Sequence, residues 1–434
     1  MQLLLIAYHF PPIGGAGSQR SAKFARYLPD FGIAPVVIAG PAGSPSRWEP
    51  EDRTQVREVG HEVTVIRPVD RPMEREDPGR WGRLLGNTTD RERWWRDQIV
   101  TLGLEAAETH HLDAILVSLQ PYLGLSGAVE LGDRLGLPVV ADLRDPWALD
   151  EVRLYLSRAH RLAERRTMGR LLDRCALVIA NTPDATSAIR EAFPFLGEDR
   201  LATITNGFDA TDFEGVATRQ PDGRFRIVHT GYLHTSIAQA QGRNRTAKAL
   251  LGGSLWAIDL FGRSHYYLLQ ALELLKLENP DLAATVDLAL AGVLSQADLD
   301  LVEQSPVRDH VKLLGYLDHR AAIHEMVQAD AVFLPMHDIP PGRRARIVPG
   351  KTYEYLASGR PILAAVPPGD ARDFVSSVGA GVVTDPSDVA GIARAIEALA
   401  AGSPTPRRVP EGIERFERRE LTRRLAGHLE KLDY

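Results

Sequence analysis

Cysteine is nearly absent: Cys175 is the single one in a chain of 434 residues, so no internal disulfide framework can form. The N-terminal apolar run LLLIA is too short for a secretory signal and has no positively charged residue before it. No apolar run approaches the ~18 to 20 residues that span a bilayer. Together these absences predict a reducing, cytoplasmic environment.

An excess of positive charge is also missing. The formal net charge is −6 at pH 7, whereas a general nucleic-acid binder is usually basic, so we expect no nucleic-acid partner. The composition, 44% hydrophobic and 25% charged, is that of a globular protein. Because a chain of 434 residues is longer than a domain with one ordinary hydrophobic core, two domains are expected.

Short apolar runs alternate with helix-length segments such as Ser18–Leu28, Arg93–Thr109 and Tyr122–Leu135. Runs rich in Val, Ile and Leu without polar alternation indicate strands buried on both faces of a parallel sheet. In the first half the predicted strands are Leu3–Tyr8, Val36–Ala39, Val63–Ile66, Ala114–Ser118, Val139–Ala141, Leu177–Ala180 and Ala202–Thr205. In the second half they are Arg226–Thr230, Val286–Ala291, Val311–Leu313, Ala331–Leu334, Ile362–Ala365 and Gly381–Thr384. This alternation predicts an α/β protein made of two Rossmann-like, doubly wound domains.

The polar segment Val216–Phe225 is the predicted linker, which gives an N-terminal domain over residues 1–215 and a C-terminal domain over residues 216–410. A charged amphipathic helix over Arg415–Leu432 follows a proline-rich stretch, and we expect residues 411–434 to return to the first domain. Ligands bind beyond the carboxyl ends of the strands in open α/β sheets, so two such domains facing each other would form a deep cleft. The long polar connection Ser236–Gly253 is typical of a lid or of a disordered loop.

The stretch HFPPIGGAGSQR, residues 9–20, places a glycine loop between a predicted strand and a predicted helix. Gly15 and Gly17 match the first two glycines of the dinucleotide fingerprint, but Arg20 stands at the third position and the next strand ends without a carboxylate for a ribose. No Lys-Ser/Thr pair follows, so the loop is not a P-loop either. What remains is a loop that permits close backbone approach, followed by a helix that Ser18 could cap and whose N-terminus could meet an anion. A tight turn without a ligand is the alternative.

The segment VPGKTYEYLASGRPILAA, residues 348–365, is more informative. Pro349 and Gly350 open a short predicted helix that ends at Gly359. Lys351 in its first turn, together with free helix amides, would suit a diphosphate. Glu354, on the same helix face, could accept hydrogen bonds from a ribose diol. A surface ion pair between these two side chains is the alternative.

The order and spacing of several motifs resemble the GT-B glycosyltransferases, specifically the large retaining family four (glycosyltransferase group 1). The motifs of the first half are FPPIGGAGSQR, VVADLRDPW (139–147), VIANTPDAT (178–186) and ITNGFDATDF (204–213). Those of the second half are IVHTGYL (227–233), VKLLGYL (311–317), ADAVFLP (329–335) and PGKTYEYLASGRPIL (349–363).

The resemblance implies that the second domain binds the nucleotide-sugar donor and that the first binds the acceptor. Glu354 matches the second Glu of the family's Glu-x7-Glu motif, which holds the donor ribose, and Arg263 falls where the family places a phosphate-contacting Lys. The full set of expected donor-binding residues is Gly14, Gly15, Gly17, Tyr232, Arg263, Gly315, Tyr316, Leu317, Gly350, Lys351, Thr352 and Glu354.

Two positions depart from the family pattern. The family's first Glu, which contacts donor-sugar hydroxyls, would be Arg346, so either Asp338 or the main chain serves instead, or the donor sugar is unusual. Arg144 stands where many relatives have a His near the reacting sugar. We expect Arg144, Asp145 and Arg263 to act in catalysis.

The resemblance implies transfer of a sugar, as by a hexosyl-type enzyme, with retention at the anomeric carbon, without a cofactor and without a divalent metal. Cationic side chains and helix N-termini would stabilise the departing phosphate. The acceptor could be a polysaccharide precursor, a lipid-linked glycan or a natural-product aglycone. The alternatives are a nucleotide-sugar isomerase (epimerase) on the same fold and a catalytically inactive binding subunit.

Seven arginines, at positions 153, 158, 161, 165, 166, 170 and 174, lie on one predicted helical segment. A solvated helix is the favoured interpretation. A surface attracted to anionic lipid is the alternative, and it would give a peripheral contact at the inner face of the membrane.

Overall fold

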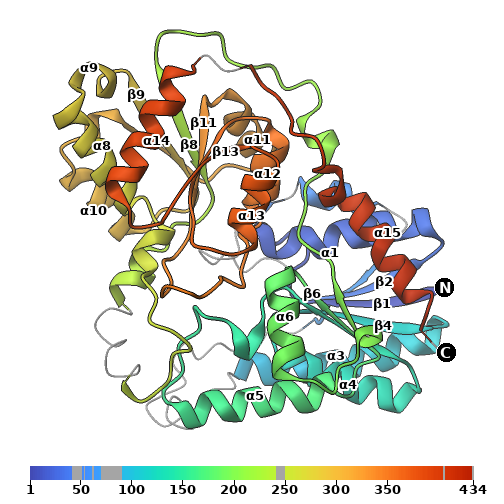
Figure 1. Cartoon of the computed structure of the whole chain (residues 1–434). Helices are drawn as coiled ribbons and strands as arrows, with labels where there is room; N and C mark the ends of the chain where they lie inside the picture. Colours follow the sequence, from blue (N-terminus) through green and yellow to red (C-terminus); the bar gives the residue numbers. More distant parts are fainter. Residues whose placement is uncertain are drawn as a thin grey trace. The chain divides into compact units, whose positions relative to one another are not determined.

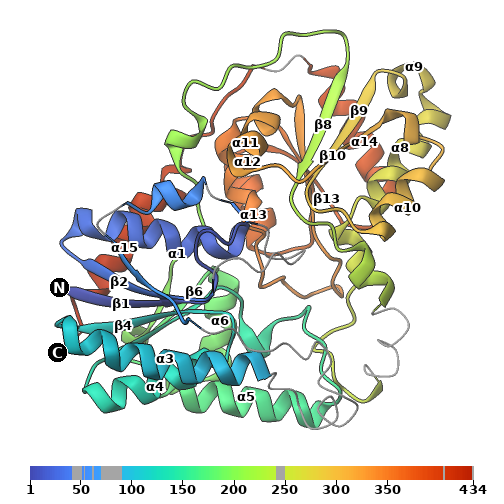
Figure 2. The same cartoon turned by 180° about the vertical axis from the view of Figure 1, so that it is seen from behind.

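The computed structural model describes residues 1–41, 51–52, 54–60, 63–69, 90–240, 250–403 and 406–432. They form two compact units, each built on one sheet. Unit 1 comprises the described parts of 1–206, 251–253 and 418–432, and unit 2 comprises those of 207–250 and 254–417. Figures 1 and 2 show the elements of each unit from opposite sides.

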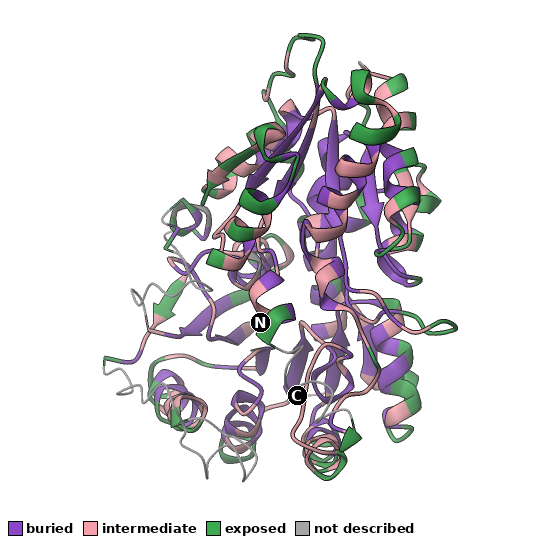
Figure 3. Cartoon of the chain, turned by 90° about the vertical axis from the view of Figure 1, so that its left-hand side faces the viewer, coloured by how far each residue is buried: buried purple, intermediate pink, exposed green. Residues whose placement is uncertain are grey.

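The unit 1 sheet has seven parallel strands in the order β3-β2-β1-β4-β5-β6-β7. The strands are β1 (Gln2–Ala7), β2 (Ala34–Ala39), β3 (Thr64–Ile66), β4 (Ala114–Leu119), β5 (Val139–Leu143), β6 (Leu177–Ala180) and β7 (Leu201–Thr203). The central strands are buried along nearly their whole length (Figure 3), as the continuous apolar runs predicted.

Helices cover both faces of this sheet (Figure 1). One face carries α1 (Ala16–Tyr27), the 3₁₀ helix η1 (Leu28–Phe31) and α15 (Arg418–Leu429). The other carries α3 (Asp90–Thr109), α4 (Gly124–Leu135), α5 (Arg158–Leu172) and α6 (Pro183–Ala192). Short 3₁₀ turns η2 (Gln55–Glu58), η3 (Trp147–Leu149) and η4 (Glu198–Arg200) complete the unit.

The unit 2 sheet has six parallel strands in the order β10-β9-β8-β11-β12-β13. They are β8 (Phe225–Thr230), β9 (Val286–Ala291), β10 (Val311–Gly315), β11 (Ala331–Pro335), β12 (Ile362–Ala365) and β13 (Gly381–Thr384). One face packs on α8 (Tyr266–Glu278), α9 (Pro280–Ala283), α10 (Gln296–Gln304) and α14 (Val389–Ala401). The other packs on η5 (Ala210–Phe213), α11 (His319–Gln328), α12 (Lys351–Ser358), α13 (Asp370–Ser377) and η8 (Glu414–Phe416). The turns η6 (Leu260–Arg263) and η7 (Arg308–His310) connect these elements.

Local sequence explains where several helices begin. The Thr182 hydroxyl accepts a hydrogen bond from Ala185 N–H, and Pro183 occupies the first helical position of α6. Ser295 and Asp298 form a reciprocal capping box at α10. Each cap satisfies main-chain donors that a helix leaves open at its N-terminus, and so fixes the start of the helix.

Three details differ from the sequence-based expectations. The predicted cap Ser18 is wrong: α1 starts at Ala16 after Gly15, and the buried Ser18 hydroxyl donates to Ile13 O at 2.5 Å and lies 3.0 Å from Gln55 Oε1. A helix that starts earlier turns this hydroxyl inward. The units divide after residue 206, not after residue 215, because Phe208 and Phe213 lie in the unit 2 core.

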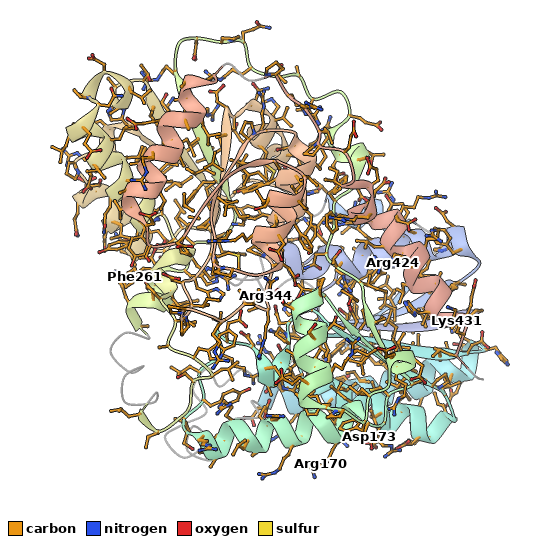
Figure 4. The ribbon with its side chains drawn as sticks, in the orientation of Figure 1. Arg170, Asp173, Phe261, Arg344, Arg424 and Lys431 are labelled. Carbon is orange, nitrogen blue, oxygen red and sulfur yellow. The ribbon has the colours of Figure 1, made fainter. Side chains whose placement is uncertain are left out.

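The seven arginines do not share one helix, which is the third difference. Arg153 and Arg174 lie outside α5; the Arg153 guanidinium stands 4.9 Å from the ring of Tyr122, and Arg174 forms a surface ion pair. Arg170 is exposed and points away from the body of unit 1 in Figure 4.

Residues 241–249 of the predicted lid lie outside the described residues. Within the described part of the chain, no helix is both long and apolar enough to cross a bilayer.

Candidate active site

Unit 2 has a topological switch point between its central strands β8 and β11. The chain runs outward through β9 and β10 and then returns to β11, so the connections that leave β8 and β11 diverge. Such a point leaves room for a ligand beyond the carboxyl ends of the strands. The segment after β8 and the helix α12, which follows the β11 connection, bring Gly231 and Lys351 together there.

The Lys351 amine contacts the end of β8. Its Nζ lies 3.1 Å from Nε2 of His229. Gly231 has a φ of +105°, and a Cβ added there would lie 2.9 Å from Nζ. The positive φ therefore favours glycine at this position, and a side chain there would displace the amine of Lys351.

The charge state of this amine is strongly perturbed. Burial, with the positive charge of Arg263 as the second cause, lowers the pKa of Lys351 to about 7, although Glu354 acts in the opposite direction. Burial, reinforced by Lys351, also holds the pKa of His229 well below its ordinary value. The like charges of Lys351 and Arg263 therefore favour an anion at this site, while the imidazole of His229 stays neutral.

Glu354 is buried, with 9% of its surface exposed, so this carboxylate does not lie at the surface. Its Oε1 lies 3.0 Å from Nε2 of His319, the first residue of α11. Nδ1 of the same imidazole lies 3.9 Å from Oδ2 of Asp212. The carboxylate is thus held by a histidine of the neighbouring helix α11.

The remaining unit 2 candidates lie around this point. Arg263 ends η6, and its carbonyl accepts from His234 N–H at 3.1 Å, which ties η6 to the segment containing Tyr232. Gly315 ends β10, and its carbonyl accepts from Gly292 N–H at 2.7 Å. Tyr316 is exposed, and Leu317 is partly buried. In Figure 4 the labelled Phe261 marks the position of η6.

Helix α12 begins and ends where the sequence predicts. Gly350 precedes its first residue, and Gly359 follows its last with a φ of +66°. Thr352 is fully buried, and its N–H donates to Pro349 O at 3.0 Å. The helix therefore presents Lys351 and Glu354 to the site, while Thr352 faces the interior.

Arg346 stands at the position of the family's first Glu, and Asp338 is the side chain that could serve in its place. The structure gives both of them contacts elsewhere. The Arg346 guanidinium lies 4.9 Å from the ring of Trp256. Asp338 Oδ2 accepts from the Ser387 hydroxyl at 2.6 Å, and the main chain of Asp338 pairs with Asp259. Asp338 thus lies beside the start of η6, which carries Arg263.

Unit 1 has its own switch point, between β1 and β4. The Arg144 side chain, just after β5, contacts both the end of β4 and the loop and helix start that follow β1. Its Nε donates to Leu119 O at 2.6 Å, one Nη donates to Gly17 O, and the other lies 3.2 Å from His9 Nδ1. Burial is the main cause that lowers the pKa of Arg144. Gly15 and Gly17 lie at the start of α1, directly after Gly14 in the loop that follows β1.

The other residues of this site are fixed by side-chain contacts. Gln120 Nε2 donates to Asp145 Oδ2 at 3.2 Å. Arg20 and Asp142 form a buried ion pair at 2.7 Å, and Arg20 also donates to the carbonyl of Ile204 at 2.8 Å. Among the described residues, no group of three or more His, Cys, Asp or Glu side chains could hold a metal ion.

Sequence reasoning missed four side chains of these sites: His229, His319, His9 and Gln120. His229 stands in the motif IVHTGYL, where a histidine directly after the apolar pair Ile227-Val228 of a predicted buried strand was a signal for a functional side chain. His319 follows VKLLGYL closely, but nothing in its spacing indicates a contact with a residue 35 positions away.

Two family models match the chain in succession. The model described as Glycosyltransferase Family 4 matches residues 18–212, and the model described as Glycosyl transferases group 1 matches residues 259–401. The chain belongs to the group 1, family 4 glycosyltransferases. It is a glycosyltransferase enzyme of the GT-B fold. No curated protein sequence matched the chain.

Solved structures support the fold of this glycosyltransferase. Anabaena HepE in complex with UDP is 17% identical with a TM-score of 0.61, over 99% of this chain and 100% of that one. A glycosyltransferase from Rickettsia africae is 11% identical with a TM-score of 0.64, over 100% and 99%. Sucrose-phosphate synthase from Thermosynechococcus elongatus is 13% identical with a TM-score of 0.65, over 99% and 98%.

Proposed function

We propose that this glycosyltransferase transfers a hexosyl group, with retention at the anomeric carbon, from a nucleoside-diphosphate sugar bound by unit 2 to an acceptor hydroxyl bound by unit 1. The observation that carries the proposal is the site beyond β8, where Lys351 and Arg263 concentrate positive charge and Glu354 lies one helical turn from the lysine. A diphosphate matches the charge, and a ribose diol matches the carboxylate.

The nucleoside of the donor is proposed to be uridine, because HepE, which has the same fold, was solved with UDP and with UDP-glucose. The chain offers two side-chain cations for the departing diphosphate, and we propose that these make a divalent metal and a cofactor unnecessary. Since the transition state is oxocarbenium-like, neutralising the leaving group is the main task of the site.

The acceptor is proposed to be a glycan precursor, lipid-linked or free.

The first experiment is a thermal-shift screen of the purified chain against UDP, GDP, ADP, CDP and dTDP. We expect one of them, UDP, to stabilise the protein clearly more than the others. The corresponding nucleotide sugars are then incubated with acceptor mixtures, and the products are analysed for transfer, hydrolysis and epimer formation. An epimer without a transfer product would favour the isomerase alternative, and binding without any turnover would favour an inactive subunit.

Arg263→Ala tests the role of the second cation. We expect kcat to fall about 10²- to 10³-fold, the effect of losing one donor to a developing anion. Arg308→Ala is the matched control, since Arg308 is exposed in η7, before the amino end of β10. Equal kcat/KM for Arg263→Ala and the wild type would remove Arg263 from the mechanism.

A further inference from the structure

The hydrogen-bond partners of His229 show which side chain is the donor in its contact with Lys351. His229 Nδ1 lies 3.0 Å from the carbonyl oxygen of Phe333. A carbonyl only accepts, so Nδ1 carries the hydrogen, and Nε2 of the neutral ring is left with its lone pair. The 3.1 Å contact between Nε2 and Nζ is therefore a hydrogen bond that Lys351 donates to a neutral imidazole.

The imidazole stays neutral because of its surroundings. His229 is fully buried in β8. Besides burial, the charges of Lys351 and His265 lower its pKa, and main-chain hydrogen bonds with Phe333 and Tyr232 oppose them only in part. A neutral acceptor tolerates both forms of the lysine, since a primary amine and an ammonium group can each donate to it.

The amine has little opposite charge around it. From η6, Arg263 adds a like charge, and from α12, Glu354 is the opposing carboxylate. Glu354 is already bonded to His319 of α11. The free enzyme thus holds a lysine where an ammonium group is poorly compensated.

We propose that Lys351 takes up a proton when the donor diphosphate binds, and that His229 is the positioning residue that holds the amine in both states. This inference rests on the proposed function. The step forms one N–H bond: a neutral amine and one proton from solvent give an ammonium group, with no oxidation or reduction. The incoming phosphate charge supplies the compensation that the free site lacks.

The proton is counted by isothermal titration calorimetry of UDP binding at pH 8 in phosphate and in Tris, which differ in ionisation enthalpy. At pH 8 UDP is already fully ionised, so uptake reports on the protein. We expect about 0.9 proton taken up per UDP, because a group with a pKa of about 7 is about nine-tenths neutral at pH 8. By linkage, Kd should rise about tenfold between pH 8 and pH 9.

Two variants separate the charge from the positioning. Lys351→Arg keeps a permanent cation, so we expect UDP binding with no proton uptake and a flat pH profile above pH 7. His229→Phe keeps a buried ring but removes the Nε2 acceptor, so we expect a higher Kd for UDP, a higher donor KM with a smaller change in kcat, and a fall in affinity that begins at lower pH. His310→Phe is the matched control: Nδ1 of His310 lies 3.1 Å from Val286 O at the amino end of β9, whereas His229 lies near the carboxyl end of β8.

The outcomes distinguish this inference from the proposed function. UDP binding without proton exchange in the wild type would refute the inference and leave the donor site standing. A His229→Phe variant that loses stability but keeps the wild-type pH profile and KM would refute the positioning role. Failure of UDP and the other four nucleoside diphosphates to bind would overturn both.

Discussion

Replacing Lys351 by Met should make the folded protein more stable while abolishing donor binding. The pKa falls from an ordinary 10.5 to about 7, which at about 1.4 kcal/mol per pH unit corresponds to about 4 to 5 kcal/mol against the charged amine in the folded state. The amine also starts α12, where a cation opposes the helix dipole. Methionine fills a similar volume without either penalty.

One loss acts in the other direction. Without Lys351, Nε2 of the buried His229 has no donor from that side, which costs about 1 to 3 kcal/mol. The net expectation at pH 6 is a gain of about 1 to 4 kcal/mol, or roughly 5 to 10 °C in the melting temperature of a unit of this size for the middle of that range.

The gain must depend on pH with a definite sign. Because the lysine pKa is lowered in the folded state, the unfolded chain binds more protons between pH 7 and about 10.5, and wild-type stability rises with pH across that window. Below pH 7 the penalty is fully present. The advantage of Lys351→Met should therefore be largest at pH 6 and shrink toward zero by about pH 9.

The assay is urea unfolding followed by circular dichroism at pH 6 and pH 9, with UDP binding measured in parallel. Lys312→Met is the control, since Lys312 is exposed on the edge strand β10 and should change stability by less than about 0.5 kcal/mol. A Lys351→Met variant that is less stable than the wild type at pH 6 would refute the reasoning about a poorly compensated amine.

Three further perturbations follow from the same contacts. Arg20→Met leaves the buried Asp142 carboxylate without its cation, so urea unfolding should show a loss of about 3 to 5 kcal/mol, and a loss below 1 would mean that solvent reaches the carboxylate. Gly231→Ala forces a side chain against Lys351 at a positive φ, so the Kd for UDP should rise at least about tenfold, and unchanged calorimetry would contradict the close approach. Glu354→Ala should weaken UDP binding by about 1 to 3 kcal/mol without affecting the affinity for inorganic diphosphate, which lacks a ribose; equal losses for both ligands would argue against a ribose contact.

The strands could be predicted from sequence because each is a short apolar run buried on both faces. Within the described residues, every predicted strand has a counterpart with ends within two residues. The boundary between the two units was harder to predict from the sequence. Phe208 and Phe213 look like any aromatic residues in a loop, and only their packing in the unit 2 core assigns them. Ser18 shows the same limit, since a serine near a helix start indicates a cap only when the start itself is known.

The site was predictable to the extent that its residues are close in sequence. Lys351 and Glu354 share one helical turn, and a glycine on either side fixes the limits of the helix. Their partners were not predictable in this way. His229 and His319 reach them across the fold, from β8 and α11, and residue spacing carries no information about such contacts.

The two switch points hold their cations in different ways, and the difference bears on how the enzyme works. Arg144 donates to two main-chain carbonyls, those of Leu119 and Gly17, so its guanidinium fixes the backbone of unit 1 and keeps its charge at any physiological pH. Lys351 donates to a neutral imidazole and has a pKa near neutrality. The arginine therefore acts on geometry, whereas the lysine can change its charge when an anion arrives. An adjustable cation belongs in the unit that must both bind a diphosphate donor and release a nucleoside diphosphate product, because a charge that is absent from the empty site does not need to be compensated after the product leaves.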